Sequence, residues 1–558
     1  MILGIDLGTS NSLAAAVKDG EVVIVKNKAG GEVIPSVLSV DEQGNIYAGN
    51  MAIHRKNKYG DKTIGMFKRS MGSADKFSLN DKEYSARELS AILLKAIKNM
   101  AEEYFMEEIN EAVISVPAFF NNLQRKAVID AGKMAGFDVK RIVNEPTAAA
   151  VAYGVENTEE DSKVILVLDL GGGTFDISVM EVNGNVMEVI AVCGDNNLGG
   201  GDFTRRLIEL FKKHHNITKS LSKEEEESLF LSAESAKKDI TLEGKATIKC
   251  MIDGSEYVYE ITESEYEKAC TDLIEKIRKL TIRAIEESKY EPSEIKDILM
   301  VGGGTKLSIV KKMVEKMIGS EISYIINPEE AVVRGVALYG ALMNKDESVN
   351  KIVMTDICPH YIGCWAYNGK NYDCVGIFDT IVKKNTTIPV KKTIVHYSWP
   401  NTWELSVLQC DNEYGIDAVE LDLYRYEVPY LNTGDKVEIH KSTIIDSDGI
   451  IYSEVFIPAN GMRYGKVVQL DEVEMSKEER ENRISELYNF SNNYNEQNEF
   501  DELLARGERV YAEASGKMRD VIAEYLGRYE EVLGTGKLAK IKQEAEVLKK
   551  FLDVCERG

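Results

Sequence analysis

Hydrophobic and polar positions divide the chain into stretches with different periodicities. From residue 1 to about 345, short apolar runs typical of buried strands alternate with segments whose apolar residues recur every three to four positions, as at 85–105 and 122–137. This alternation predicts an α/β region. From about 359 to 473 the apolar runs are short, as at 403–410 and 449–457, and turn signals separate them. That pattern predicts an antiparallel β domain.

The last stretch has a helical pattern, and the junction before the β domain is apolar. Ser476 is followed three residues later by Glu479, a capping box that predicts a helix start. At the junction, Ile352, Val353 and Met354 form an apolar triplet where a passive linker would be polar. This triplet is either a buried final strand or a segment that docks in one state and is exposed in another.

Two turns rich in glycine follow apolar runs and carry the candidate chemistry. The stretch "DLGGGTFD", from Asp169 to Asp176, places three glycines between acidic residues, and "DLGTS" repeats the arrangement from Asp6 to Ser10. Successive backbone N–H groups in such turns bind phosphate, and the carboxylates fit a hydrated Mg²⁺ between them and the phosphate. One such turn by itself could equally be a hairpin turn with solvated aspartates. Two of them, each read as strand, turn, strand, predict duplicated halves that hold one ligand.

Further glycine turns narrow the class of nucleotide site. The run from Asp297 to Met317 predicts a strand, a turn at 302–304 and a helix, which would let a flat base approach the backbone. A weaker glycine turn occupies 198–203, and no Walker signature occurs in the chain.

Composition and charge exclude several function classes. The 558 residues are 44% hydrophobic and 29% charged, as in an ordinary soluble protein, and the net charge of −24 disfavours nucleic acid or an anionic membrane as a general partner. No apolar run is as long as a membrane span and no basic leader precedes the first strand, so we expect a cytoplasmic protein. Eight cysteines without a CxxC pair and only six histidines argue against a zinc site.

With these residues in view, the chain resembles the DnaK family of heat-shock chaperones over essentially its full length. The motifs fall in the family order: "GIDLGTSNS", "FKRSMG", "VISVPAFF", "RIVNEPTAAAVAYG", "LDLGGGTFDIS", "GDNNLGGGDF", "NPEEAVVRG", "KKNTTIPV" and "VLQ". The short tail and "MTDICP" look closest to the short bacterial HscC-type members. The resemblance implies an actin-like ATPase domain with duplicated ribonuclease-H-like halves at 1–346, an apolar linker at 347–358, a β-sandwich peptide-binding domain at 359–475 and a short helical lid at 476–558.

The resemblance also implies roles at the matching positions, with ATP or ADP and Mg²⁺ as cofactors. Lys68 would orient the hydrolytic water at the γ-phosphate, and Glu145 would help to position it. Asp6 and Asp169 would hold Mg²⁺ through water, and Asp176 would hold the attacking water. The residues implied to contact the phosphates are Gly8, Thr9, Ser10, Asn11, Gly171, Gly172, Gly173, Thr174, Gly199 and Gly200, with Thr174 also catalytic.

On the adenosine side, the resemblance implies contacts from five residues: Glu234, Lys237, Thr241, Gly302 and Gly303. Thr241 replaces the serine of many relatives and keeps the hydroxyl. Lys306 replaces the common arginine that packs on the adenine. Because an ammonium stacks less well than a planar guanidinium, we expect weaker nucleotide binding.

Coupling between the domains is assigned by resemblance to Pro117, Arg125, Arg141, Asp356 and the triplet 352–354, with Glu145 also in the relay. Arg141 also matches a contact of the J-domain co-chaperone, whereas the exchange factor stays undetermined. From spacing alone, Pro117 would be a strand end and Arg125 a surface charge.

The resemblance implies that the β domain binds extended apolar peptides through six residues: Ile362, Cys364, Tyr367, Trp403, Leu405 and Val407. Trp403 stands where the family usually has a residue the size of valine. It either narrows the peptide pocket or is ordinary core, and the sequence favours neither interpretation.

These expectations describe an ATP-hydrolysing chaperone for unfolded polypeptides, whose affinity for peptide is switched by ATP binding and hydrolysis. Two alternatives stay open: a nucleotide-gated scaffold dedicated to one partner and, less favoured, a small-molecule kinase of the same superfamily. The kinase leaves the β domain, linker and lid unexplained.

Overall fold

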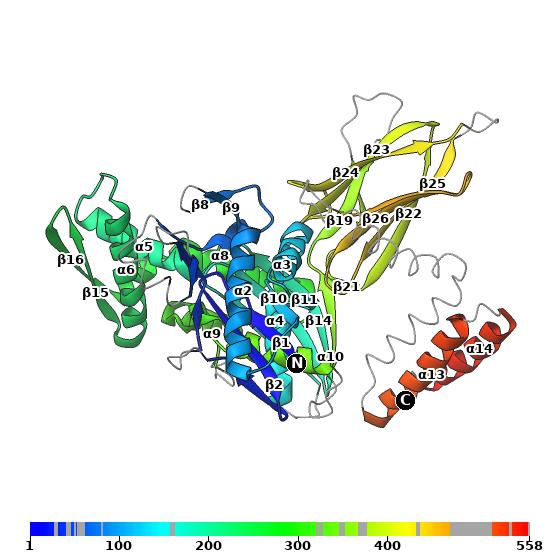
Figure 1. Ribbon diagram of the computed structural model, residues 1–558, viewed down its shortest axis with the longest axis horizontal. Coiled ribbons are helices and arrows are strands. Elements are labelled where there is room, and N and C mark those ends of the chain that lie inside the picture. The colour runs from blue at the N-terminus through cyan, green and yellow to red at the C-terminus, as the bar shows by residue number, and fades with distance from the viewer. Residues whose placement is uncertain are drawn as a thin grey trace.

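The structure of the chain is a computed structural model (Figure 1). It describes residues 1–26, 32–40, 46–49, 52, 62–79, 82–156, 162–319, 322, 327–344, 352–366, 377–430, 436–468, 516–534 and 538–555. The capping box predicted at Ser476 lies outside the described residues. Among the described residues, no helix is both long and apolar enough to cross a membrane.

The first half of the α/β region is a mixed sheet in the order β11-β10-β1-β2-β3, with β4 beside β2. Its strands are β1 (Ile2–Asp6), β2 (Asn11–Lys18), β3 (Glu21–Ile24), β4 (Ile34–Pro35), β10 (Glu111–Val116) and β11 (Asp138–Asn144). Strand β1 pairs antiparallel with β2 and parallel with β10. The predicted first hairpin is therefore confirmed.

The second half repeats this pairing in the order β17-β12-β13-β14-β18-β21. Its strands are β12 (Lys163–Leu170), β13 (Phe175–Asn183), β14 (Val186–Asp195), β17 (Ile295–Val301), β18 (Val353–Cys358) and β21 (Thr386–Ile388). Strand β12 pairs antiparallel with β13 and parallel with β17, as β1 does with β2 and β10. The two hairpins thus occupy equivalent places in two similar sheets, as an internal duplication predicts.

Two apolar helices, α4 (Glu145–Glu156) and α10 (Ala331–Met343), lie between the sheets and share a core with both. They approach closely at Gly335, where any side chain would overlap the Ala148 carbonyl oxygen. Glycine is therefore required by helix packing at this position.

The remaining elements of the α/β region cover the two sheets or extend from them. The helices are α2 (Ala86–Phe105), α3 (Asn122–Met134), α5 (Gly200–His214), α6 (Lys223–Glu243), α7 (Glu263–Ala269), α8 (Thr271–Ser288) and α9 (Ser308–Ile318), with 3₁₀ turns η2 (Phe67–Ser70), η3 (Pro292–Glu294) and η4 (Gly303–Lys306). The small sheets are formed by β5 (Val37–Val40), β6 (Ile46–Ala48) and β7 (Thr63–Gly65), by β8 (Lys76–Leu79) and β9 (Lys82–Ser85), and by β15 (Lys245–Ile252) and β16 (Ser255–Thr262). Capping boxes at Ser85 and Asn121 fix the starts of α2 and α3, close to the predicted positions.

The β domain consists of two four-stranded antiparallel sheets that share apolar clusters, so it is a sandwich. One sheet has the order β20-β19-β23-β24, and the other has the order β22-β25-β26-β27. The strands are β19 (Tyr361–Ala366), β20 (Ile377–Val382), β22 (Val390–Ser398), β23 (Asn401–Cys410), β24 (Val419–Val428), β25 (Val437–Ile445), β26 (Ile451–Ile457) and β27 (Met462–Val467).

The apolar triplet leads into a strand of the α/β region. Val353 and Met354 pair in parallel with Val186 and Met187 of β14, and Ile352 packs against the core shared by the two sheets. Farther along β18, Asp356 pairs with Ile388 of β21. The described part of the segment between the domains, residues 352–358, therefore adds a strand to the second sheet, and Figure 1 shows the sandwich beside α3.

The C-terminal part contains α13 (Gly516–Gly534) and α14 (Leu538–Cys555), which pack on one another. The rings of Tyr525 and Phe551 stack with centroids 4.0 Å apart. This pair confirms that the tail contains amphipathic helices.

Candidate functional site

The two predicted glycine turns lie face to face where β1–β2 and β12–β13 reverse direction. A methyl group on Gly172 would overlap the Ser10 hydroxyl, and one on Gly173 would lie 2.6 Å from the Thr9 side chain. At Gly199, before α5, a methyl group would lie 2.5 Å from the Gly173 nitrogen. Part of the requirement for glycine therefore comes from the close approach of the turns to one another.

The glycine turns are also tied to neighbouring backbone. The Gly200 N–H donates to the Gly171 carbonyl oxygen at 2.8 Å, and the Gly171 N–H donates to the Thr174 carbonyl at 3.0 Å. On the other turn, the Gly8 N–H donates to Ser12 Oγ at 3.2 Å, and a side chain at Gly8 would overlap the Asn11 carbonyl. These bonds hold both turns in fixed shapes.

Lys68 is a buried cation beside these turns. It lies on η2, and its Nζ donates to Glu145 Oε1 at 2.8 Å, at the first residue of α4. Both side chains are buried. The Lys68 ammonium also lies 5.6 Å from the centre of the Phe120 ring.

Three further carboxylates complete the site. Asp6, at the end of β1, accepts a hydrogen bond from Ser115 Oγ at 2.8 Å. Asp169 and Asp176 face one another in the register of β12 and β13. Asp176 Oδ1 accepts the Phe119 N–H at 3.0 Å, while its Oδ2 is buried and has no hydrogen-bond partner in the described part of the chain.

Burial and mutual repulsion make these carboxyl groups hard to ionise. Burial and the charge of Glu145 raise the pKa of Asp6 to about 7 and that of Asp176 to about 7. The same two causes raise the pKa of Asp169 well above its usual range. The charge of Lys68 lowers all three pKa values, but by less than burial and Glu145 raise them. The unpartnered oxygen of Asp176 and the excess of hard oxygen donors fit a divalent cation such as Mg²⁺.

The described residues give no sign of a site where several side chains ligate a metal directly. Among the described residues, no group of three or more histidine, cysteine, aspartate or glutamate side chains could hold a metal ion.

The predicted adenosine contacts on α6 form one network with the start of α5. Lys237 Nζ donates to Glu234 Oε2 at 2.7 Å, to Thr204 Oγ1 at 2.9 Å and to the Gly200 carbonyl at 3.1 Å. Burial lowers the pKa of Lys237, although Glu234 opposes this. The Thr241 hydroxyl donates to the Lys237 carbonyl at 3.2 Å. This network joins the glycine turn at 199–201 to the helix that carries the predicted contacts.

Gly302, Gly303 and Lys306 form the turn after β17. Gly302 has φ of +79°, and a methyl group there would lie 2.8 Å from Asp169 Oδ1. Lys306 is half exposed and forms an ion pair with Glu329 at 2.9 Å. The structure thus brings the third glycine turn against Asp169, and its contact with a nucleotide base stays a prediction.

The predicted coupling residues form a chain of polar contacts from the acidic site to the β domain. Asp356 Oδ2 accepts hydrogen bonds from Asn144 Nδ2 at 2.5 Å and from Thr147 Oγ1 at 3.3 Å. Asn144 Oδ1 in turn accepts Arg125 Nη2 at 2.8 Å, and Arg125 is buried. The interpretation of Arg125 as a surface charge, which spacing alone favours, is therefore wrong.

Further hydrogen bonds hold this series of polar contacts in place at its two ends. Arg125 also donates to the carbonyls of Ala118 and Phe120, and the Phe120 N–H donates to the Pro117 carbonyl at 3.1 Å. Arg141 donates to Ser447 Oγ and pairs with Asp448 at 3.3 Å.

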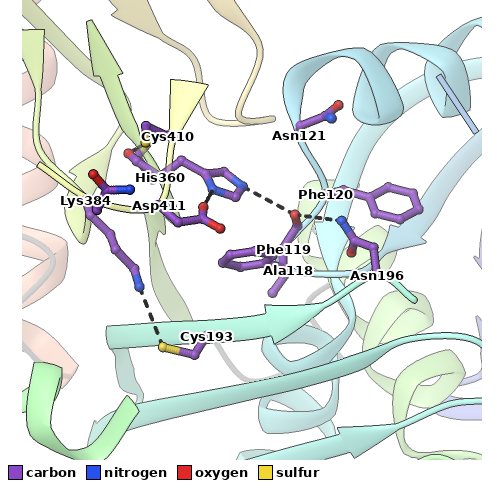
Figure 2. Close-up of polar contacts among 12 residues, drawn as sticks. Ala118, Phe119, Phe120, Asn121, Cys193, Asn196, His360, Lys384, Cys410 and Asp411 are labelled. Carbon is purple, nitrogen blue, oxygen red and sulfur yellow. Dashed lines mark hydrogen bonds and ion pairs between the residues drawn. The ribbon is translucent and has the colours of Figure 1, made fainter. Parts of the chain in front are cut away.

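Several residues of this interface were not among the predicted site residues, although Lys384 lies in the motif "KKNTTIPV". Asn122 exchanges hydrogen bonds with the Val468 carbonyl and the Ile451 N–H, each at 2.8 Å. Lys384, which is labelled in Figure 2 and is buried between β20 and β21, forms an ion pair with Glu287 of α8 at 2.7 Å. These partners are more than 90 positions apart in the chain, so only the tertiary structure identifies them.

Arg69 is a further residue that the motif analysis missed. Its Nε donates to the Gly173 carbonyl at 3.1 Å, and its Nη2 pairs with Asp202 at 2.7 Å. It therefore ties η2, which carries Lys68, to the glycine turn of the second half. Its place in "FKRSMG", next to Lys68, was the available signal.

The predicted peptide-binding residues divide between two clusters of the sandwich. Ile362 and Val407 belong to one cluster, and Cys364 and Leu405 to the other, and all four are buried. Trp403 is half buried against the second cluster, and its indole N–H donates to the Trp399 carbonyl at 2.9 Å. Tyr367 lies outside the described residues. Their role in peptide binding stays a prediction.

Comparisons with known proteins give a consistent result. The family model described as Hsp70 protein matches residues 2–78 and 74–556. A protein named chaperone protein DnaK from Thermosipho melanesiensis is 37% identical over 468 residues, which cover 81% of this chain and 77% of that protein. Proteins of the same name from Thermosipho africanus and Thermotoga petrophila are 33% and 34% identical, and each comparison covers 94% of this chain and more than 90% of the relative.

Proposed function

The chain belongs to the Hsp70 family, and on that premise we propose that the docked strand β18 is the element through which its nucleotide site controls its β domain. Membership of this family makes the chain an ATP-dependent molecular chaperone that binds unfolded polypeptides and hydrolyses ATP. The N-terminal region is the actin-like ATPase domain, and the β-sandwich is the substrate-binding domain. The pair α13–α14 would belong to the lid.

The geometry supports specific roles in hydrolysis. Lys68, Glu145 and Asp176 would orient the attacking water, and the backbone of the two opposed glycine turns would hold the phosphates, with the Thr9, Ser10 and Thr174 hydroxyls beside them. A Mg²⁺ ion, when bound, neutralises phosphate charge during phosphoryl transfer. Asp6 and Asp169 are the residues that would hold it through water. The burial of Lys68 supports this assignment, because a buried cation acts on developing charge more strongly than a solvated one.

One observation carries the coupling proposal: Asn144, which binds Asp356 of β18, directly precedes Glu145, which binds Lys68. A change at the γ-phosphate side of the site would therefore reach β18 through two adjacent residues. Arg141, whose partners here are Ser447 and Asp448, is also the proposed contact for a J-domain co-chaperone. Coupling of this kind is reciprocal, so peptide would change nucleotide turnover if nucleotide changes peptide binding.

Release of a fluorescent leucine-rich peptide from the purified full chain tests the proposal. Addition of ATP should release the peptide faster than addition of ADP, and Asp356→Ala should remove the difference while peptide binding persists. A suitable control is Asp379→Ala, whose carboxylate pairs with His396 within the sandwich. Peptide binding that does not respond to nucleotide in the unchanged chain would contradict the proposal and favour the dedicated scaffold.

A further inference from the structure

Lys441 is a buried lysine inside the β-sandwich. The residue is 8% exposed and lies on β25 between Ile439 and Ile445, which belong to the two apolar clusters of the core. Because alternate residues of a strand share one face, Lys441 points between the two sheets with these isoleucines. Its Nζ lies 3.9 Å from Cys364 Sγ of β19, in the opposite sheet. Burial of an ammonium is costly unless the charge is paired, so this lysine needs a partner.

The described part of the chain provides no anion that pairs with Lys441. Burial raises the pKa of the Cys364 thiol, although the charge of Lys441 opposes this, so the thiol is neutral and only a weak acceptor. The charge of Asp379 also acts on Cys364, but the contact of its Oδ2 is with His396 Nε2, at 3.1 Å. Among the described residues, no ion pair involves Lys441.

His396 does not compete with Lys441 as a second cation. Burial and then the charge of Lys441 lower the pKa of His396, and Asp379 compensates only in part. An ordinary imidazole has a pKa of about 6.5, so a ring with a lowered pKa is mostly neutral at pH 7. The positive charge at this place in the core is therefore that of the lysine.

Lys441 meets residues that the sequence assigns to peptide binding. Cys364 and Leu405 belong to one apolar cluster, and Trp403 packs on it. Cys364 lies near the end of β19, which pairs antiparallel with β23, and Trp403 lies near the start of β23. The three residues thus lie toward one end of the sandwich, where the half-buried Trp403 reaches the surface. A peptide side chain that enters at this end would meet the Lys441 ammonium.

We propose that Lys441 determines the specificity of the substrate-binding domain, because its ammonium binds a carboxylate of the client, supplied by an aspartate or glutamate within an otherwise apolar segment. A carboxylate accepts strong hydrogen bonds from an ammonium, and the low dielectric of the core strengthens them, whereas a neutral amide gains much less. The inference rests on the proposed peptide-binding role of Cys364, Leu405 and Trp403. It deepens that role by naming the class of substrate.

Two fluorescent leucine-rich peptides with blocked ends, identical except for a central glutamate or glutamine, test this by anisotropy with the full chain and ADP. The glutamate peptide should bind about tenfold or more tightly than the glutamine peptide, the range expected for a hydrogen bond to a charged group. Lys441→Met should bind both peptides equally, because methionine has a similar length and no charge. Lys441→Arg keeps the cation and should keep the preference.

Lys392→Met is the matched control, because it removes the same charge from an exposed position on the neighbouring strand β22. This variant should keep the preference for glutamate. Thermal denaturation of Lys441→Met checks its fold. An apolar side chain in place of an unpaired buried charge should leave Tm unchanged or raise it, so a loss of preference would not reflect unfolding.

The outcomes separate this inference from the functions on which it builds. Equal binding of the two peptides by the unchanged chain, or a glutamate preference that persists in Lys441→Met, would overturn the role of Lys441 and leave peptide binding intact. If neither peptide binds to the unchanged chain, the peptide-binding role of the sandwich residues fails and the inference fails with it. Coupling through β18 is tested independently by release on ATP.

Carbodiimide coupling provides a second test that needs no variant. This reagent joins a carboxylate to an adjacent amine as an amide, and the blocked glutamate peptide has one carboxylate. Mass spectrometry of the digested complex should identify the peptide on Lys441, and the glutamine peptide should give no product. Products confined to exposed lysines such as Lys392 would contradict the proposed contact.

Discussion

Asp356 and Asn144 lie 212 positions apart in the chain and share a hydrogen bond of 2.5 Å between a partly buried carboxylate and a buried amide. Asn144 ends β11, and Glu145, the next residue, begins α4 and binds Lys68. The polypeptide therefore places the contact with the interdomain strand and the contact with the hydrolytic lysine on consecutive residues. This is a short physical route by which one site can bias the other.

Asn144→Ala should uncouple the two domains without disabling hydrolysis. The change removes the bonds to Asp356 and Arg125 and leaves these two charged groups with fewer partners, so β18 should bind less strongly. ATP-driven peptide release should slow by about tenfold or more, corresponding to one lost charged hydrogen bond of about 1.5–3 kcal/mol. Stopped-flow peptide release measures this. Release at the unchanged rate would exclude this contact from the route.

Lys68→Ala should abolish hydrolysis while preserving the release of peptide on ATP binding. Loss of a cation that stabilises the transition state typically lowers the rate by about 10²–10³-fold. Single-turnover hydrolysis of radiolabelled ATP measures the effect. Lys312→Ala, which removes an exposed ion pair with Glu263, is the control and should hydrolyse ATP normally. Hydrolysis within a few-fold of normal in Lys68→Ala would reject the assigned role.

The free energy of unfolding without nucleotide should fall as pH rises toward 7. The pKa of Asp176 is about 7 in the folded chain and about 3.9 in an unfolded one, so the folded state binds the extra proton between these values. The stabilisation that comes from protonated Asp176 is complete below about pH 4 and is lost as pH rises through about 7. Asp176→Asn removes this titration. In this variant the free energy of unfolding should fall between about pH 4 and pH 7 by roughly 2–4 kcal/mol less than in the unchanged chain.

Urea denaturation at several pH values measures this difference, and Asp253→Asn, which removes an exposed ion pair with Lys219, serves as the control. Addition of Mg²⁺ and ADP should reduce the pH dependence of the unchanged chain, because a bound cation favours ionised carboxylates. Parallel profiles for Asp176→Asn and the unchanged chain would show that this carboxyl group does not carry the effect.

Lys306→Arg should tighten nucleotide binding. Lys306 is 47% exposed and is held by Glu329, which an arginine can bind equally well while placing a planar guanidinium beside the turn at 302–303. A cation–π contact at an exposed site contributes about 0.5–1 kcal/mol, or a two- to fivefold lower Kd for ADP. Calorimetry measures it, with Lys311→Arg on the next helix as the control. An unchanged Kd would place Lys306 away from the base.

Trp403→Val distinguishes the two interpretations that the sequence left open. If the indole narrows a peptide pocket, the variant should bind a wider range of apolar peptides and lose only about 1–2 kcal/mol of stability, since Trp403 is half buried. Binding to a peptide array and thermal denaturation measure the two effects. Trp365→Phe, in a different cluster, is the control. Lower stability with an unchanged peptide profile would identify Trp403 as ordinary core.

The sequence by itself determined those features that depend on neighbours along the chain. The hairpins around Asp6 and Asp169, the starts of α2 and α3 and the change to short strands after β18 all follow from local periodicity, capping and turn residues, and each is found in the structure. Phosphate-binding turns are of this kind, because adjacent backbone N–H groups form them.

Only the tertiary structure decided which distant residues meet. The glycines of 171–173 are required partly by Thr9 and Ser10, Arg125 is buried by Asn144 and the carbonyls around it, and His360 acquires Asp411 and Phe119 as partners. The physical reason is that burial and side-chain partners are set by packing between elements far apart in sequence, which no local pattern encodes. Motif matching pointed to Lys68 and Asp356, but the network that joins them exists only in three dimensions.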